Sequence, residues 1–431
     1  MTTSENRADF TAEELAGLRK DFPITARIGR GGQPLAYLDS SATAQKPIWV
    51  MDAVSEFYSR HNGAVNRGTH LLADESTTAY EEGRDAVAKF IDASSSEEVV
   101  WTRNATEGVN LLAYSMLNAS LGAGGAEAEQ FKIGPADRIV VTRAEHHANL
   151  VPWQQLAERT GAEFAWLDLT SDGCIDLDTL NVITPNTKVV AFTHVSNVTG
   201  AISPVEAIVA AARKVGALVV LDTTQSAAHM PISVRELGAD FAVLSGHKLC
   251  GPTGIGVLWG RKELLDALPP FMTGGSMITD VQMEKTSFHA APARFEAGTQ
   301  AVGQIVGFKA ALDYLSEVSM ERVAAHEAAI TRQLLEGIKQ IDGVHVLGPK
   351  EADNRVAVVS FVVDGVHPHD VGQILDSHSI AIRVGHHCAI PLHKHFGVRA
   401  SARASASLIT SAEEIDRFLD ALGQVRKFFG V

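Results

Sequence analysis

The sequence is short of cysteine, with only Cys174, Cys250 and Cys388 among its 431 residues, far apart from one another. This number and spacing argue against a disulfide framework. They also provide no C-x-x-C pair of the kind that structural zinc sites use. We therefore expect a cytoplasmic protein, because in that reducing compartment a free thiol can stay reactive.

Long apolar runs and an excess of basic charge are absent as well. No stretch approaches the ~20 residues of a membrane-spanning helix, and the polar start, residues 1–15, does not resemble a signal peptide. The 51 acidic residues outnumber the 37 basic ones, and the net charge of −14 argues against a nucleic-acid or anionic membrane partner. With 45% hydrophobic and 20% charged residues, the composition is typical of a globular protein.

Short β-rich runs alternate with helical stretches between about residues 97 and 260. This alternation predicts an α/β fold whose mostly parallel central sheet is covered by helices on both faces. Long helices and further strands after about residue 300 indicate a smaller C-terminal α/β domain. We expect a helical segment over 1–30, packed with the small domain, a large domain over 31–305 and the small domain over 306–431. Thr11 and Glu14 fit a capping box in the first segment.

Polar side chains follow several predicted strands, where open α/β sheets bind their ligands. Lys248 follows one strand within buried-looking sequence, although an isolated lysine is usually solvated. A Schiff base with an aldehyde cofactor would explain a lysine at this place. Asp222 ends another strand, where a carboxylate often caps a helix. In an enzyme that uses pyridoxal phosphate, such a carboxylate pairs with the protonated ring nitrogen.

Groups at neighbouring strand ends could hold the rest of this cofactor. A predicted helix start offers backbone N–H groups, which favour a phosphate. Each group is weak evidence alone, but their occurrence at successive strand ends favours pyridoxal phosphate. The candidates are Gln225 for the ring hydroxyl, His146 or His147 for stacking or proton transfer, and Ser245, His247, Ala105 and Thr106 for the phosphate.

The segment RVGHHCAIPLH, residues 383–393, leaves open whether Cys388 is a metal ligand, a nucleophile or a core thiol. Structural zinc sites usually take their ligands as spaced pairs that include several cysteines, and this segment has one cysteine. Cys174 and Cys250 are interpreted as structural. The possible zinc ligands are His386, His387, Cys388, His393 and His395.

The sequence contains six distinctive motifs: EHHANLVPWQ, THVSNVTG, SGHKLCGPTGIGVL, GGSMI, RFEAGT and RVGHHCA. Together they resemble the motifs of the SUF-type cysteine desulfurases. These are class-V aminotransferases, which are fold-type I pyridoxal phosphate enzymes. The resemblance extends from LAYLDSSATAQKP at 35–47 to the final helix. It implies that Lys248 is the cofactor lysine and that Cys388 is the nucleophile. At the cofactor, it implies Asp222, Gln225 and His146 around the ring, and Thr106, Ser245 and His247 at the phosphate, together with Thr299 of the partner subunit. At the substrate, it implies Asn197, Arg383 and Arg403.

The resemblance implies a homodimer that converts L-cysteine to L-alanine and keeps a persulfide on Cys388. The sulfur would pass to a small acceptor protein of the SUF system for iron–sulfur cluster assembly, and His369 would contact an acceptor that carries zinc. Two alternatives stay open. One is a selenocysteine lyase or another β-eliminating enzyme on the same scaffold, and the other is a non-catalytic scaffold protein.

Several positions depart from the pattern of this family without removing a proposed catalytic group. Asn66 stands where a histidine is usual, and Gln300 replaces a proline. Thr223 and Thr224 stand where smaller residues or a cysteine are common, and the segment around Ala406 lacks an expected aromatic residue and asparagine. We expect these departures to affect the pocket wall, the dimer-facing loop and the rate.

Overall fold

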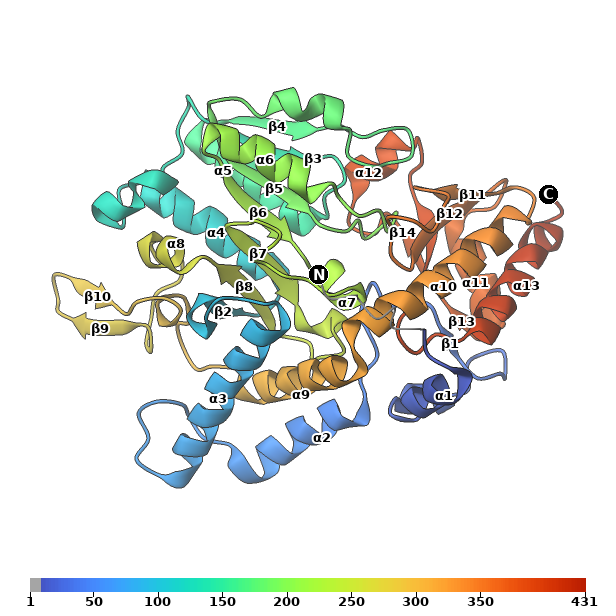
Figure 1. Ribbon diagram of the computed structural model, residues 1–431, viewed down its shortest axis with the longest axis horizontal. Helices are drawn as coiled ribbons and strands as arrows, with labels where there is room; N and C mark the ends of the chain where they lie inside the picture. Colours follow the sequence, from blue (N-terminus) through green and yellow to red (C-terminus); the bar gives the residue numbers. More distant parts are fainter. Residues whose placement is uncertain (1–8) are drawn as a thin grey trace, which may run out of the picture.

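A seven-stranded sheet forms the larger part of the computed structural model, which describes residues 9–431 (Figure 1). Its described strands run parallel except β8, which is antiparallel to both of its neighbours. The prediction of an α/β fold with a mostly parallel sheet is therefore confirmed. In spatial order the strands are β2 (Val99–Thr102), β8 (Gly256–Gly260), β7 (Phe241–Ser245), β6 (Leu218–Asp222), β5 (Thr187–Thr193), β3 (Arg138–Thr142) and β4 (Glu163–Leu167).

Helices bury both faces of this sheet, because successive strand residues point to opposite sides. On β3, Val140 joins a core with α3, α6 and α9, whereas Val141 joins a second core with α4, α5 and α8. The strands are consequently apolar on both sides. These helices, with the nearby α2 and α7, are α2 (Ile48–Glu56), α3 (Leu71–Phe90), α4 (Ala105–Ser120), α5 (Val151–Thr160), α6 (Val205–Val215), α7 (Ser226–His229), α8 (Lys262–Ala267) and α9 (Val302–Val318).

A smaller antiparallel sheet, of order β11-β12-β15-β14, lies beside the first and is covered by α10, α11 and α13 (Figure 1). Phe361 and Phe418 pack edge to face in its core. The hairpin β9 (Ile278–Val281) and β10 (Thr286–Phe288) belongs to neither sheet. The remaining elements are α10 (Met320–Lys339), β11 (Val344–Leu347), β12 (Val358–Val363), α11 (Pro368–Ser377), β14 (Arg383–Gly385), α12 (Ile390–His395), β15 (Ser401–Ser405) and α13 (Ala412–Phe429).

The start of the described chain contacts the C-terminal part of the molecule. Helix α1 (Ala12–Lys20) begins with the predicted capping box, in which the Glu14 N–H donates to Thr11 Oγ1. Both guanidinium nitrogens of Arg19 donate to Glu414 of α13 at 2.9 Å. Strand β1 (Ala36–Tyr37) pairs in parallel with β13 (Ile380–Ala381), so this strand lies in the smaller core. The predicted helical segment and the polar start both include residues 1–8, which lie outside the described residues.

The predicted boundary at 305/306 falls within α9, which packs against α2 and α3. After β1 and Leu38, the next residue of the chain that belongs to the core of the smaller unit is Ile330 of α10. The domain boundaries stay a prediction.

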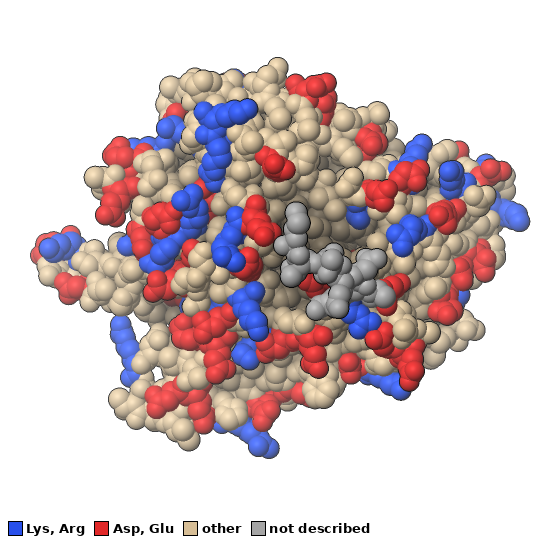
Figure 2. All heavy atoms as spheres, in the orientation of Figure 1, with Lys and Arg blue, Asp and Glu red and all other residues tan. Residues whose placement is uncertain are grey.

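No helix among residues 9–431 combines the length and the apolar character needed to cross a bilayer. Figure 2 shows carboxylates gathered over the region of α2, α3 and α9, where Asp52, Glu81 and Asp313 are exposed.

A buried ion pair joins α3 to the segment that follows β10. Arg84 donates to both carboxylate oxygens of Glu296, at 2.8 and 2.9 Å, and the side chains are 4% and 5% exposed. The Tyr80 hydroxyl and the backbone N–H of Trp101 also donate to Glu296. This carboxylate therefore fixes the start of the chain segment that carries Thr299.

Replacing Glu296 with glutamine is expected to lower the free energy of unfolding by about 3–5 kcal/mol, because Arg84 would keep a buried, uncompensated charge. Urea denaturation measures this change. Glu81→Gln is the matched control, since Glu81 pairs with the same Arg84 but is 54% exposed, and it should cost about 1 kcal/mol or less. Equal losses in the two variants would contradict the assignment of the buried pair as the stronger one.

Candidate active site

The carboxyl ends of the parallel strands meet at one edge of the large sheet, and a cavity of about 270 Å³ lies there. Asp222 is the last residue of β6, Ser245 is the last of β7, and His146 and Asn197 follow β3 and β5. The smaller sheet closes the other side of the cavity with groups from β14, β15 and the loop between β14 and α12. The lining comprises Ser41, Ala42, Asn104, Ala105, Thr106, His146, Ala148, Thr193, Val195, Asn197, Asp222, Thr224, Gln225, Ser245, His247, Lys248, Arg383, His387, Cys388 and Arg403.

Lys248 lies at the end of the 3-10 turn Gly246–Lys248, directly after β7. Removal from water lowers the pKa of Lys248 to about 8, although the charge of Asp222 opposes this shift. Asp222 is buried and accepts the Thr224 N–H at 3.0 Å, which orients the carboxylate. The site therefore holds a lysine that loses its proton more readily than an ordinary one.

Two histidines beside Lys248 are neutral at physiological pH. Burial lowers the pKa of His146 to about 3, and the Lys248 charge acts in the same direction. Burial and Lys248 likewise lower the pKa of His247 to about 4. His146 Nδ1 accepts the Ala148 N–H at 3.0 Å, so the proton of its neutral ring is on Nε2. His146 thus has a fixed tautomer and can stack on a ring or pass a proton.

Two arginines lie side by side because Arg383 of β14 and Arg403 of β15 are cross-strand partners. Asp39 accepts three hydrogen bonds from Arg383, at 2.9 to 3.1 Å, and lies 3.5 Å from Arg403 Nη2. Arg403 Nη1 also donates to the Asn197 carbonyl at 2.8 Å. One carboxylate facing two guanidinium groups leaves a net positive charge, which suits a substrate carboxylate.

Cys388 is exposed and lines the same cavity as Lys248. Three of the neighbouring histidines bond groups other than this thiol. His387 and His393 both bond Ser401 Oγ at 3.0 Å, and His395 bonds the Thr170 carbonyl. Within residues 9–431, no group of three or more histidine, cysteine and acidic side chains could hold a metal ion.

Four of the five predicted phosphate-binding residues line the cavity. Ala105 and Thr106 are the first two residues of α4, where backbone N–H groups lack intrahelical acceptors. Ser245 Oγ accepts the Ala105 N–H at 2.9 Å. Ser245 and His247 line the cavity with them, whereas Thr299 lines a separate cavity with Tyr80, Trp101 and other residues. In one chain, Thr299 is therefore not brought to the site.

The side chains of the cavity fit pyridoxal phosphate. Thr224 Oγ1, Gln225 Oε1 and Arg403 Nε are buried and have no hydrogen-bond partner within residues 9–431. All three residues line the cavity. Buried polar atoms are normally paired, so these atoms call for a polar occupant. Gln225 Oε1 can accept from a ring hydroxyl, and Lys248 and Asp222 supply the amine and carboxylate that the cofactor needs.

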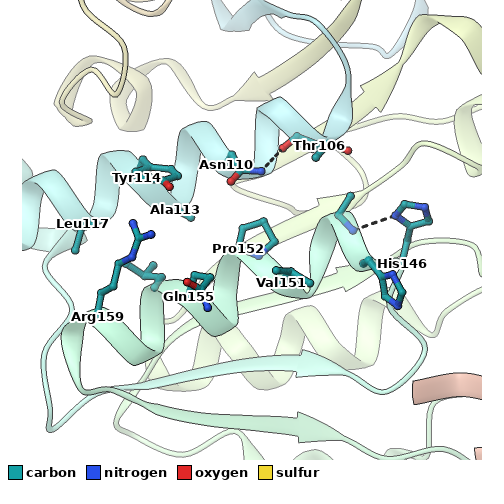
Figure 3. Close-up of a pocket in the computed structure, with 13 residues that line it drawn as sticks. Thr106, Asn110, Ala113, Tyr114, Leu117, His146, Val151, Pro152, Gln155 and Arg159 are labelled. Atoms are coloured by element: carbon teal, nitrogen blue, oxygen red, sulfur yellow. Dashed lines mark hydrogen bonds between the residues drawn. The ribbon is translucent and has the colours of Figure 1, made fainter. Parts of the chain in front are cut away.

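A second cavity, of about 370 Å³, runs between α4 and α5. It shares Thr106, His146 and Ala148 with the candidate site. Figure 3 shows Tyr114 and Arg159 toward one end of this groove and His146 at the other. His146 therefore lies at the common edge of the two cavities.

The departures from the expected motifs lie mostly away from the cavity. Of the five positions, Thr224 alone lines it. Thr223 is buried, and its hydroxyl donates to the Val243 carbonyl. Asn66 has a φ of 74°, a left-handed conformation that asparagine tolerates better than most residues. Gln300 and Ala406 bond the backbone of Glu296 and Ala357.

Two residues that shape this site, Asp39 and Glu145, were not predicted from the sequence. Asp39 neutralises part of the positive charge of Arg383 and Arg403. In the sequence, the only indication of such a role was the position of Asp39 in the segment LAYLDSSATAQKP. Glu145 is buried and accepts hydrogen bonds from Asn149 and from the Thr193 N–H, so it joins the ends of β3 and β5. Burial raises the pKa of Glu145 to about 8. Its position directly before His146 was the available signal.

Comparison with known proteins places this fold and site in one family. The class-V aminotransferase model matches residues 36–418. The chain therefore belongs to the class-V aminotransferase family, whose members bind pyridoxal phosphate.

Within this family the chain is similar to several cysteine desulfurases. The chain is 51% identical to probable cysteine desulfurase 2 of Mycobacterium leprae, over 98% of this chain and 99% of the relative. It is 44% identical to a cysteine desulfurase of Klebsiella pneumoniae, over 98% and 100% of the two chains. The solved apo cysteine desulfurase of Thermococcus onnurineus NA1 is 38% identical, with a TM-score of 0.88 over 98% of this chain and all of the other. The predictions of a fold-type I scaffold, of pyridoxal phosphate and of a cysteine desulfurase are confirmed.

The rate at which the apoprotein takes up pyridoxal phosphate is expected to rise with pH, with a midpoint near pH 8, and to level off about one pH unit higher. Lys248 must lose its proton before it can bond the cofactor aldehyde, and its pKa is about 8. An ordinary lysine would give a rate that still rises near pH 10. Stopped-flow absorbance at a series of pH values measures this midpoint. Asp222→Asn should move the midpoint lower, because Asp222 raises the Lys248 pKa; an unchanged midpoint would contradict this coupling.

Proposed function

We propose that this protein converts L-cysteine to L-alanine and stores the released sulfur as a persulfide on Cys388. We further propose that it acts as a cytoplasmic homodimer and supplies a small acceptor protein of the SUF system for iron–sulfur cluster assembly. One observation carries the proposal. A single cavity brings Lys248, from the edge of the large sheet, together with Cys388, from the loop after β14.

The same cavity contains groups that suit an amino acid substrate. Arg403, with Asn197 behind it, would bind the carboxylate, and Arg383 would assist once it exchanges Asp39 for the substrate. Bound pyridoxal phosphate supplies an electron sink for the α-carbon. Lys248 would take the α-proton, because its lowered pKa leaves a usable fraction of free amine.

Cys388 would then attack the sulfur of the substrate as a thiolate, which is the nucleophilic form of cysteine. A sulfur–sulfur bond forms as the carbon–sulfur bond of the substrate breaks. The electron pair of the broken bond stays with the substrate carbon, which takes up a proton. L-Cysteine and the enzyme thiol thus become L-alanine and the enzyme persulfide, with no external oxidant or reductant.

The location of Thr299 supports the homodimer. Thr299 lines a cavity other than that of its own candidate site, whereas the family resemblance assigns it to a phosphate. Thr299 of the partner subunit would therefore complete the phosphate site. Buried Glu296 holds the segment that presents this threonine.

The surface position of Cys388 supports sulfur transfer to another protein. Cys388 is exposed, so an acceptor thiol can approach a persulfide there. His369 is also exposed, beside His367, whose side chain caps the N-terminus of α11. His369 is the proposed contact for an acceptor that carries zinc.

The test is a single turnover of the protein loaded with pyridoxal phosphate, without reductant. One equivalent of alanine per site should appear, and mass spectrometry should find one added sulfur atom on the peptide that contains Cys388. Pyruvate in place of alanine would instead establish a β-eliminating enzyme. A much higher turnover with L-selenocysteine would favour a selenocysteine lyase, and no product from either amino acid would leave a scaffold role.

A further inference from the structure

The loop that carries Cys388 has an unusual backbone conformation. His387 and Cys388 have φ values of 48° and 55°, so two successive residues other than glycine are left-handed. Side chains with a Cβ atom disfavour this region of backbone space. Such a conformation persists only where surrounding contacts impose it. The contacts that hold this loop should therefore decide where the thiol lies.

His147 makes two hydrogen bonds to the loop backbone, at Cys388 and at Ile390. Its N–H donates to the Cys388 carbonyl at 2.7 Å. Its side chain accepts the Ile390 N–H at Nε2, at 3.2 Å. His147 belongs to the 3-10 turn after β3 and directly follows His146, which lies at the end of the groove in Figure 3. A residue that follows a strand of the large sheet thus contacts a loop that follows a strand of the smaller one.

Other hydrogen bonds also hold the loop backbone. Asn197 Nδ2 donates to the His387 carbonyl at 2.7 Å, on the N-terminal side of the thiol. His386 Nδ1 accepts the Cys388 N–H at 3.1 Å, but His386 is part of the same loop. On the C-terminal side, Ala389 is buried in the core of the large sheet, and His147 bonds both the Cys388 carbonyl and the Ile390 N–H. The Ile390 bond is the one that a change of the His147 side chain removes.

We propose that His147 is a positioning residue, whose Nε2 fixes the C-terminal side of the Cys388 loop and so keeps the thiol in the cavity with Lys248. The proposal rests on the function proposed above for Cys388. An Nε2 acceptor requires a neutral ring with its proton on Nδ1. Burial, and then the neighbouring His386, lower the pKa of His147, which is consistent with that neutral form.

Two substitutions separate the hydrogen bond from the packing of the ring. His147→Phe keeps a planar ring but removes the acceptor, and His147→Gln places an amide oxygen near the position of Nε2. Both keep the backbone bond to Cys388. Hydrogen exchange of the holoenzyme, without substrate, should be at least about tenfold faster at Ile390 in His147→Phe and close to wild type in His147→Gln. Equal exchange in wild type and His147→Phe would overturn the proposal, as would loss of protection in both variants.

The second measurement is the rate of persulfide formation on Cys388 in a single turnover. A small displacement of a reacting group can reduce a rate about a hundredfold. We expect a decrease of roughly this size in His147→Phe, with an unchanged KM and cofactor spectrum, and a near-normal rate in His147→Gln. If His147→Phe is unstable, His147→Ala also removes the acceptor, and His147→Gln, which lacks the ring but keeps an acceptor, is its control. Rates that are equal in all variants would contradict the role of His147.

The two measurements also distinguish the failure of this proposal from failure of the proposed function. If wild-type protein forms no persulfide, the function fails, while faster exchange in His147→Phe would still show that His147 holds the loop. If wild-type protein forms the persulfide and exchange is the same in all variants, only the positioning role fails.

Discussion

Serine in place of Cys388 is expected to reduce alanine production from L-cysteine by roughly a thousandfold or more, with pyridoxal phosphate still bound. A serine hydroxyl is almost never ionised at neutral pH and does not attack sulfur as a thiolate does. Cys388 is the single cysteine that lines the cavity within the described residues. Alanine release, measured with reductant present, tests this expectation, and the cofactor absorbance shows whether the variant still binds pyridoxal phosphate.

Cys174→Ser is the matched control, because Cys174 is partly buried and does not line the cavity. It should keep the alanine production of the wild-type protein. If Cys388→Ser made alanine as fast as wild type, another group would have to accept the sulfur. If Cys174→Ser lost activity to the same extent, the assignment of one reacting thiol would be wrong.

Replacing Lys248 with alanine is expected to abolish both the covalent link to pyridoxal phosphate and the conversion of L-cysteine. The rate should fall by at least about a thousandfold, because this lysine would also move the α-proton. In the wild-type protein, reduction with borohydride should leave the cofactor attached to the peptide that contains Lys248. The same treatment should leave no labelled peptide in Lys248→Ala.

Lys248→Arg separates the reactive amine from its charge. The guanidinium keeps a positive charge near Asp222 but stays protonated at all relevant pH values. We therefore expect this variant to be as inactive as Lys248→Ala. Substantial alanine production by Lys248→Arg would show that charge, rather than a free amine, is what the site requires. A labelled peptide that lacks Lys248 would contradict its assignment as the cofactor lysine.

Much of the large sheet could be predicted because parallel strands leave a strong signal in sequence. Their buried runs alternate with helices, and polar residues such as Asp222 and Ser245 follow directly where each run ends. Since parallel strands end at the same edge of a sheet, this pattern already indicated that these side chains meet. The predicted cofactor and substrate residues all line the cavity except Thr299 and His147, which was the alternative to His146.

The contacts of Asp39 and His147 could not be predicted in the same way. Asp39 reaches Arg383 across 344 positions of the sequence, and His147 reaches Ile390 across 243. Neither residue belongs to a periodic pattern that would mark its partner. The packing of β1 against β13 is equally distant in sequence, and a strand of two residues carries almost no signal of its own.

By itself, the sequence determined the α/β class, the order of chemical groups along the strand ends and the three isolated cysteines. These properties follow from local patterns of hydrophobicity and from residue chemistry. Only the tertiary structure decided which groups share a cavity, which carboxylate faces the two arginines, and how the left-handed loop at Cys388 is held. These depend on the docking of the smaller sheet against the edge of the larger one, where contacts form between residues hundreds of positions apart.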